Sequence, residues 1–547
     1  MTMRRFFVLT TVVLTAALLA GPAMSAGPVE AGGDYVDLVE LFEDWRAFQQ
    51  PEIRGGVPDY TLGAMAAQHL QLGDYQVRLA TFDVSSWPVD QRIDWWLVWA
   101  EMNGLDFDHR VLRPWARDPA FYSLLIDSES DTPLKEGAVI TGAIELWQLD
   151  FPLAGEEMAL FKARLEAIPA FLDQAQENLV GDARDLWQLG VRSQQGQQEA
   201  MVGLIETLGH HHPEMVAAAE MALGAIEGYI AWLTEQLPHK KGPSGIGVEN
   251  YTWYLQNVHL VPLTWEDELR LMHRELARSV AQMKMEEHQN RDLPPLDPPA
   301  DAEEWAQRNE TATVDFMRFL DESEVLEVEA FMEPAIRERL QPYSTPVESH
   351  FFAQVNLRDP RVLHCHFIHW IEKAFLRAHP HSSPIRRVSS LYNIWDSRSE
   401  GLATGMEEMM MNAGMFADSP RSRELVYIMV AMRAARAIAG LRVQSHDWTV
   451  DEAVEFATSH TPRGWFRQEG NLVVFEQQLY LRQPGYGTSY LTGKALIDEV
   501  LAERSFQLGS SFSLKGFMTD LFATGMVPVS LSRWEINGFD DWLPAPD

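Results

Sequence analysis

Apolar residues recur at intervals of three and four along most of the chain, with charged residues between them. This spacing is typical of one buried face of an α-helix. Alternation typical of strands is rare and is tempting only at 351–355 and 472–475. We therefore predict an all-α protein, predominantly helical with at most a few short strands, arranged as a large helical array around a central cleft. The clearest predicted helices span roughly 155–180, 183–208, 213–236, 264–287, 301–321, 362–378, 399–415, 420–444 and 491–505.

Short segments rich in proline and glycine interrupt this pattern. The segment 240–245, with the sequence KKGPSG, is the best candidate boundary. It would separate an N-terminal helical half, residues 27–240, from a C-terminal helical half, residues 241–547, within one continuous unit.

The first residues have the pattern of a secretory signal peptide. Arg4 and Arg5 precede an apolar run over 6–20, and small residues over 23–26 offer a cleavage site. The run is short for a membrane span of about 20 residues. We predict a signal peptide over 1–26 and a periplasmic or secreted protein, with an uncleaved anchor as the alternative. No later run is expected to insert stably into a membrane, and the absence of a nearby cysteine argues against a lipid anchor.

The composition excludes one class of partner and one kind of stabilisation. The formal net charge is −35, and such an acidic surface repels nucleic-acid phosphates. The single cysteine, Cys365, allows no internal disulfide. We expect a small-molecule or peptide ligand and no nucleic acid.

The predicted helix over 362–378 carries the first chemically suggestive cluster. On a helix, His366, His369 and Glu372 share one side, opposite an apolar stripe that includes Leu363 and Trp370. The three polar side chains either converge on one point, as metal ligands do, or form a solvated face; the pattern alone favours the solvated face. His364 flanks the apolar stripe, which is typical of a core histidine.

The predicted helix over 399–415 carries the second cluster. Glu400 and Glu407 share one face, and the residues around them are mostly apolar. Carboxylates on a buried helix are costly unless they are paired, protonated or bound to a cation. Function is one explanation. The other is an internal salt-bridge network with arginines from the same region: Arg386, Arg387, Arg398, Arg433 or Arg436.

A glycine-bearing turn over 484–490 provides a third candidate element. A turn that opens a helix exposes backbone N–H groups to an anion or a carbonyl, and Tyr486 and Tyr490 stand beside it as hydrogen-bond donors. An ordinary helix start with packed tyrosines is the alternative. Ser489 has no histidine partner nearby in sequence, so a serine nucleophile is disfavoured.

Several segments together resemble the bacterial DUF885 family, whose members look like large helical zinc metallopeptidases of the gluzincin type. The segment 400–407, EGLATGME, resembles a Glu-Gly-Trp-Ala-x-Tyr-x-Glu helix of that family, with Leu402 in place of tryptophan. The resemblance covers most of the chain after residue 26. It also includes 245–251, 383–387, Glu424, Arg433, Ala434, Arg436, 448–449 and 484–493.

The zinc motif of the family departs from its usual form here. Members with a zinc site carry His-Glu-x-x-Pro-Gly-His before the 383–387 element. If His366 takes the place of the last histidine, Pro360 and Arg361 occupy the His-Glu positions. Neither residue can bind zinc or act as a general base, and no HExxH occurs elsewhere in the chain.

The resemblance implies a hydrolase related to peptidases, in which the metal site is remodelled or degenerate. In a remodelled site His366, His369, Glu372 and Glu400 would hold zinc. Glu407 or Glu408 would be the base and Tyr490 the oxyanion donor, so that Glu400, Glu407 and Tyr490 form the catalytic set. Substrate contacts are expected from Tyr486, Arg387 and Arg433.

Two alternatives remain open from the sequence. The chain would be a non-catalytic, ligand-binding pseudoenzyme if the metal site is lost. In the other alternative, the carboxylates would hydrolyse a substrate without any metal.

Overall fold

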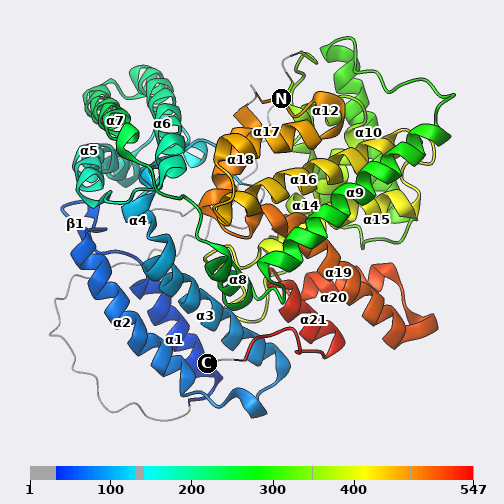
Figure 1. Cartoon of the computed structure of the whole chain (residues 1–547), viewed down its shortest axis with the longest axis horizontal. Coiled ribbons are helices and arrows are strands. Elements are labelled where there is room, and N and C mark those ends of the chain that lie inside the picture. Colours follow the sequence, from blue (N-terminus) through cyan, green and yellow to red (C-terminus); the bar gives the residue numbers. More distant parts are fainter. Residues whose placement is uncertain (1–32, 131, 133–140, 348, 469–470, 546–547) are drawn as a thin grey trace.

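The computed structural model describes residues 33–130, 132, 141–347, 349–468 and 471–545 (Figure 1). The predicted signal peptide lies outside the described residues. The fold is predominantly helical, as predicted. The helices are α1 (Tyr35–Phe48), α2 (Leu62–Ala80), α3 (Val89–Phe107), α4 (Pro114–Arg117), α5 (Gly155–Asn178), α6 (Arg184–His211), α7 (Val216–Gln236), α8 (Val248–Asn257), α9 (Trp265–Gln289), α10 (Ala302–Glu322), α11 (Met332–Arg337), α12 (Phe351–Asn356), α13 (Pro360–His366), α14 (Ile368–Ala378), α15 (Asp396–Ala413), α16 (Ser422–Gln444), α17 (Val450–His460), α18 (Asn471–Arg482), α19 (Tyr486–Leu508), α20 (Leu514–Ala523) and α21 (Val529–Asn537).

Strands are limited to two pairs of two-residue segments among the described residues. β1 (Ile53–Arg54) pairs antiparallel with β2 (Val57–Pro58), and β3 (Leu125–Ile126) pairs parallel with β4 (Ile144–Glu145). Both segments that looked like strands in the sequence, 351–355 and 472–475, are helical and belong to α12 and α18. In each case the buried residues follow helical spacing, as with Phe351 and Val355, which a four- or five-residue apolar run does not reveal.

The predicted helix over 362–378 is in fact two helices. α13 ends at His366 and α14 begins at Ile368, with Phe367 between them. The interruption changes the direction of the chain between His366 and His369. The faces derived from one continuous helix therefore do not apply to this segment.

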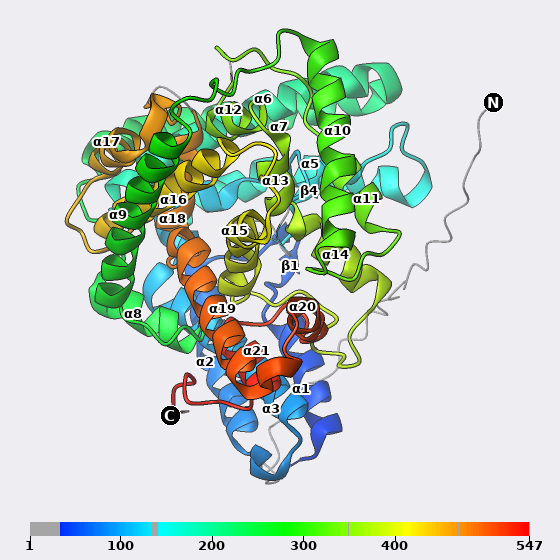
Figure 2. The same ribbon diagram turned by 90° about the vertical axis from the view of Figure 1, so that its right-hand side faces the viewer.

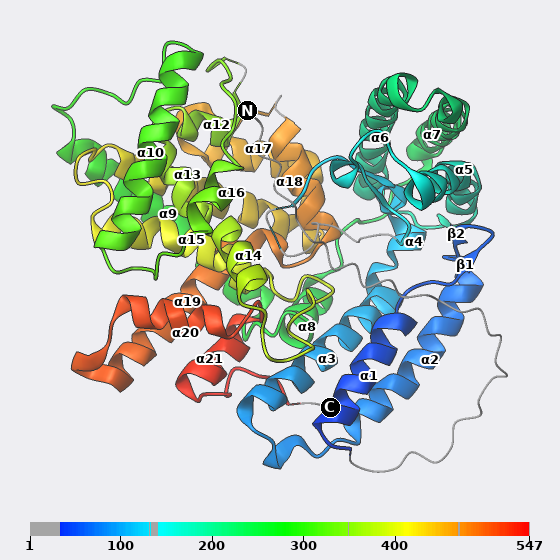
Figure 3. The same cartoon turned by 180° about the vertical axis from the view of Figure 1, so that it is seen from behind.

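The apolar core is divided into two clusters. The larger cluster joins α1–α3 with the helices from α8 to α21, so that Leu38 and Trp534 belong to the same core. The smaller cluster is built mainly by α5, α6 and α7, which stand together as a separate group in two opposite views (Figures 1 and 3). The proposed division at residues 240 and 241 stays a prediction. The boundary between the two core clusters does not coincide with it, because α1–α3 belong to the larger cluster.

Two long helices cross at backbone contact near the centre of the larger cluster. α15 and α19 meet at Gly401 and Gly493, where a Cβ added to Gly493 would lie 1.9 Å from the carbonyl oxygen of Ser397. Only glycine permits this approach. In the side view α15 and α19 lie next to each other along the middle of the molecule (Figure 2). The crossing fixes the position of Glu400 relative to the start of α19.

One helical segment among the described residues, Pro213–His239, is long and apolar enough by length and composition to cross a membrane. Its length and composition do not test the expectation that no later run inserts stably into a membrane, which stays a prediction. α7, which forms most of this segment, buries Ile226, Tyr229 and Leu233 in the smaller core cluster. A core helix of this kind passes the same test of length and composition.

Candidate functional site

A cavity of about 610 Å³ opens among α10, α12, α13, α15, α16, α18 and α19. Aromatic and aliphatic side chains, including Trp305, Phe352 and Phe475, form much of its lining. The polar side chains that also line it include His366, Glu400, Arg433, Arg436, Glu476 and Tyr490. A cavity with apolar walls and a few convergent polar groups is typical of a ligand site.

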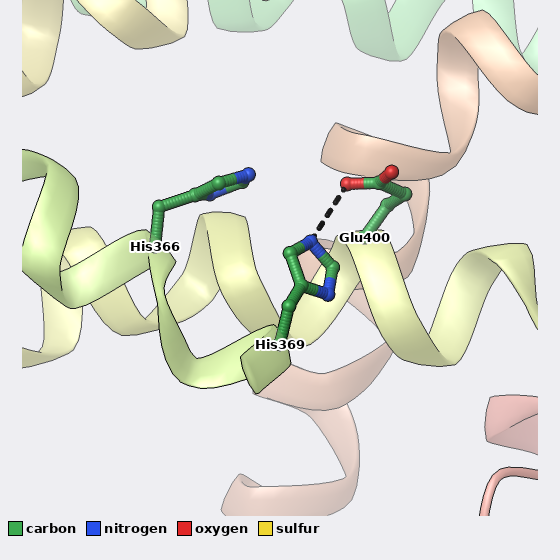
Figure 4. A group of neighbouring side chains, drawn as sticks. All are labelled: His366, His369 and Glu400. Carbon is green, nitrogen blue, oxygen red and sulfur yellow. Dashed lines mark hydrogen bonds and ion pairs between the residues drawn. The ribbon is translucent and has the colours of Figure 1, made fainter. Parts of the chain in front are cut away.

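His366, His369 and Glu400 come together beside this cavity (Figure 4). Each offers one nitrogen or oxygen, and these atoms all lie within 4.8 Å of one another. The three residues stand on three different helices, α13, α14 and α15. Because the chain turns at Phe367, both histidines face α15, and the solvated face favoured by the sequence pattern is wrong. His369 is 3% exposed.

The two histidines are each held through Nδ1. Nδ1 of His366 lies 3.1 Å from Oε1 of Glu407, and Nδ1 of His369 lies 3.1 Å from Oγ of Ser399. Nη2 of Arg433 also lies 3.3 Å from Nδ1 of His366. Since Glu407 accepts hydrogen bonds, its closer contact favours a proton on Nδ1 of His366. This arrangement leaves Nε2 of His366 for a further partner and places Nε2 of His369 against Glu400.

Glu400 is an ionised carboxylate in this environment. Its Oε2 lies 3.2 Å from Nε2 of His369, and the Tyr486 hydroxyl donates to its Oε1. Burial alone would raise the pKa of Glu400. The neighbouring charges of His369 and His366 and the hydrogen bond from Tyr486 oppose burial and bring the pKa down to about 2.

Glu407 and Glu408, the expected bases, are both engaged by arginines. Glu407 is fully buried and receives two hydrogen bonds from Arg433, at 2.6 and 2.7 Å. Burial would raise its pKa, but Arg433 and His366 together hold the pKa below the usual value. Glu408 pairs with Arg278 at 2.6 Å and does not line the cavity. The salt-bridge alternative therefore describes the contacts of Glu407.

Glu372 lies outside the group of converging ligand atoms. Arg398 donates to both of its oxygens, the closer contact being 2.5 Å, and both side chains are buried. Burial raises the pKa of Glu372 in spite of the charge on Arg398. The prediction that Glu372 lies with the two histidines depended on one continuous helix, whereas α13 and α14 are separate.

The remaining predicted site residues are divided between the cavity and the surface. Tyr490 lines the cavity, and its ring lies 4.4 Å from the Arg436 guanidinium carbon. Tyr486 is buried at the start of α19, behind Gly485 with a φ of +90°. Arg387 instead donates to the carbonyl oxygens of His381 and Ser382 and does not line this cavity.

His364 and Ser489 both have structural roles. His364 is fully buried, with Nδ1 against the carbonyl oxygen of Pro360 and Nε2 3.0 Å from Oγ1 of Thr313. It is the core histidine that its position indicated. Ser489 donates to the carbonyl oxygen of Tyr486 at 2.7 Å and is 3% exposed.

Sequence reasoning missed Glu476, a buried acid on the cavity wall. Nη1 of Arg436 donates to its Oε1, while Oε2 has no hydrogen-bond partner among the described residues. Burial raises the pKa of Glu476 despite the opposing charges of Arg436 and Arg433. The signal was present: Val473, Glu476, Gln477 and Tyr480 follow helical spacing. The strand-like pattern at 472–475 hid it.

Comparisons with solved structures show the same fold over nearly the whole chain. A candidate lipoprotein of unknown function from Shewanella oneidensis has a TM-score of 0.67 at 16% sequence identity. The match covers 91% of this chain and 97% of that one. A second candidate lipoprotein, from Colwellia psychrerythraea, has a TM-score of 0.62 at 14% identity and covers 93% and 98% of the two chains.

Among curated proteins, none matches the chain. A family model does match, and it covers the helices from α14 to α21, including His369, Glu400 and Glu476. Over residues 369–536 the chain matches the family described as bacterial protein of unknown function, DUF885, which is the family that the sequence motifs resemble.

Proposed function

We propose that the protein is a metal-dependent hydrolase related to peptidases, with His366, His369 and Glu400 as the ligands of a divalent ion such as zinc. The observation that carries this proposal is the convergence of their three ligand atoms within 4.8 Å. Two histidines and one carboxylate are a common ligand set for catalytic zinc, which keeps a fourth position open. His366 and Glu400 both line the cavity, where an open position would face a substrate.

The hydrogen bonds around the three residues fit a cation. With its proton on Nε2, His369 donates to Glu400 and accepts from Ser399. With its proton on Nδ1, directed at Ser399, Nε2 meets the Glu400 carboxylate favourably only in two cases. Either Nε2 also carries a proton, or a cation lies between them. Histidine ligands typically donate their other N–H to a carboxylate or a hydroxyl in this way. Glu407 and Ser399 supply those acceptors here.

The local charge also tolerates a cation despite two nearby arginines. Arg433 and Arg436 contribute +2, and Glu400, Glu407 and Glu476 contribute −3, so the sum is −1 with neutral histidines. A divalent ion would change this sum to +1. The cavity would then favour substrates with a polarised carbonyl or a negative charge.

The residues of the chain would divide the chemistry between them. A bound divalent ion supplies a Lewis acid that polarises a carbonyl and acidifies water. Glu476 is the candidate proton acceptor, because it lines the cavity, one of its oxygens has no partner among the described residues, and burial raises its pKa above the usual value. Tyr490 is the candidate donor to a developing oxyanion. The apolar lining would hold side chains of a peptide.

A binding protein without turnover is the second candidate. The observation that favours it is the pairing of both expected bases, Glu407 with Arg433 and Glu408 with Arg278. On this proposal the cavity retains a ligand and releases it unchanged. Metal-independent hydrolysis would rest on Glu476 and Glu400 alone, and a chelator would leave it intact.

We also propose that the protein is exported. The supports are the signal-peptide pattern of the first 26 residues and the similarity of the fold to two candidate lipoproteins. Fractionation of cells into periplasm, membrane and cytoplasm, followed by sequencing of the mature N-terminus, tests this proposal.

The decisive experiment is zinc titration of the untagged, chelator-treated protein by calorimetry, with metal analysis of the recovered complex. We expect one ion per chain, and we expect His369→Ala and Glu400→Gln each to weaken binding by tenfold or more. His379→Ala is the matched control, because His379 follows α14 but is exposed and pairs with Glu329. Absence of binding in the wild type, or equal loss in the control, would contradict the metal site.

Turnover separates the two candidate functions. The zinc-loaded protein is incubated with a peptide mixture, and the products are identified by mass spectrometry. Cleavage that a chelator abolishes and that Glu476→Gln reduces at least a hundredfold would support the hydrolase. Ligand-dependent thermal stabilisation without cleavage would support the binding protein instead.

A further inference from the structure

A second, smaller cavity of about 160 Å³ lies where the N-terminal helices meet the turn before α19. Its lining comes from α3 and the π-helical turn Asp108–Leu112 that follows it, from α8, from 391–393 and from 482–483. This cavity shares no lining residue with the larger one. Five aromatic rings contribute to its walls: Tyr60, Trp115, Phe121, Tyr254 and Tyr392.

Two hydrogen-bond acceptors in this cavity have no partner among the described residues. The Asp108 side chain has no hydrogen bond or ion pair there, and burial raises its pKa to about 7. Oε1 of Gln483 is buried without a partner, and the residue is 8% exposed. A buried acceptor such as Oε1 of Gln483 costs free energy until a donor reaches it, and the half-buried Asp108 carboxyl lines the same cavity.

The charges around the cavity leave room for one positive charge. Arg482 also lines it, but Nε of Arg482 lies 2.5 Å from Oδ2 of Asp118, and this pair is neutral overall. Asp108 adds a negative charge when its carboxyl is ionised, and an ammonium group beside it would favour that ionised form. Its negative charge also contributes to raising the pKa of Tyr254 and of Tyr392, after the larger effect of burial, and all three side chains line the cavity.

The backbone that presents Tyr392 is held in a costly conformation. Tyr392 and Asn393 have φ values of +56° and +53°, which non-glycine residues rarely adopt. The Tyr392 ring packs on Gly104, where an added Cβ would lie 2.3 Å from its Cγ. Strained residues of this kind concentrate at ligand sites, because the surrounding structure must hold them in place.

We propose that this cavity is a binding site for a primary ammonium group carried on a small apolar or aromatic body. The ammonium would donate to the carboxylate of Asp108 and to Oε1 of Gln483, and the aromatic walls would add cation–π attraction. A cavity of about 150 Å³ holds a single benzene ring, so the ligand has about one ring beside its ammonium group. The proposal is independent of the metal site and of any hydrolysis.

Calorimetric titration of the full-length mature protein with benzylamine tests the site. Benzyl alcohol, phenylacetate and benzyltrimethylammonium serve as neutral, anionic and donor-free analogues. We expect saturable binding of benzylamine, and binding at least tenfold weaker for each analogue. Equal binding of benzyl alcohol would overturn the proposal, as would tighter binding of phenylacetate, which would indicate an anion site at Arg482.

Two variants assign the effect to the proposed acceptors. Asp108→Asn keeps the shape of the side chain and should weaken benzylamine binding by roughly tenfold to a hundredfold, and Gln483→Met by roughly threefold to tenfold. Asp106→Asn is the matched control, since Asp106 is paired with Arg110 and His69 and does not line the cavity. Equal losses in Asp108→Asn and Asp106→Asn would overturn the assignment, and so would unchanged affinity in both Asp108→Asn and Gln483→Met.

Discussion

The bundle of α5, α6 and α7 and the pair α15 and α16 are both helical and well packed, but they bury different side chains. The bundle buries mainly apolar residues, and all of the buried residues of α7 are apolar. α15 and α16 bury many charged groups, among them Glu400, Glu407, Arg433 and Arg436. Buried ion pairs contribute little net stability compared with apolar packing. The comparison therefore indicates that the charges of α15 and α16 are kept for a purpose other than stability.

Breaking one buried pair should give the largest effect. Arg433→Met takes the guanidinium away from Glu407, which is 0% exposed and keeps only its contact with His366, and should lower the free energy of unfolding by about 3–5 kcal/mol. Guanidinium denaturation measures this change. The double variant Arg433→Met with Glu407→Leu should recover much of the loss. A double variant as unstable as the single one would show that packing, not the unpaired charge, dominates here.

A cavity in the bundle should cost slightly less and should spare the site. Leu165→Ala removes a fully buried side chain of α5 and should lower the free energy of unfolding by about 2–5 kcal/mol. Zinc affinity should remain that of the wild type, because Leu165 lies in the smaller core cluster. The exposed Leu160→Ala on the same helix is the control. A change in zinc affinity with Leu165→Ala would show that the two regions are coupled.

Separating α15 from α19 should have a smaller effect on stability but a direct effect on the site. Gly493→Ala places a Cβ against the Ser397 carbonyl oxygen and should cost about 1–3 kcal/mol as the helices move apart. Since Tyr486 of α19 donates to Glu400 of α15, zinc binding should weaken as well. Gly405→Ala, whose added Cβ meets only Cγ of Lys494 at 3.7 Å, is the matched control.

Glu268 is a buried acid that has no arginine partner among the described residues. The hydroxyls of Tyr251 and Thr492 donate to it at 2.8 Å, but burial prevails and raises its pKa to about 7. The folded protein therefore holds this proton more tightly than the unfolded chain. The stabilisation is complete below about pH 4.5 and is lost as the pH rises through 7.

Denaturation at several pH values between 5 and 8 measures this effect. Glu268→Gln should remove a slope of up to about 1.4 kcal/mol per pH unit. Glu266→Gln, exposed on the same helix, should leave the slope unchanged. A wild-type slope that persists in Glu268→Gln would assign the titration to another group.

Long periodic segments could be predicted from the sequence because many positions contribute to each of them. Eight of the nine predicted helices correspond to single helices, from α5 to α19. Short segments could not be predicted in the same way. The apolar runs at 351–355 and 472–475 are too short to distinguish a strand from a buried helix, and the break at Phe367 has no proline or glycine to mark it.

The candidate site was predictable in its residue types but not in its geometry. His366, His369 and Glu400 were all named from the sequence, whereas the exclusion of Glu372 depends on the direction of α14. Which arginine pairs with which carboxylate depends on helix packing. Arg433 pairs with Glu407 and Arg398 pairs with Glu372, and the two partners of each pair lie 26 residues apart in the sequence.

The break at Phe367 has a mechanical consequence. His366 and His369 belong to different helices, and Glu400 belongs to a third. Any ion bound by all three would therefore cross-link α13, α14 and α15. It would also close the loop of residues 379–395, which joins α14 to α15 outside any α-helix or strand. Local opening of that loop and release of the ion would then be one linked event. The affinity of the protein for the ion could then be measured from the protection of this loop against hydrogen exchange.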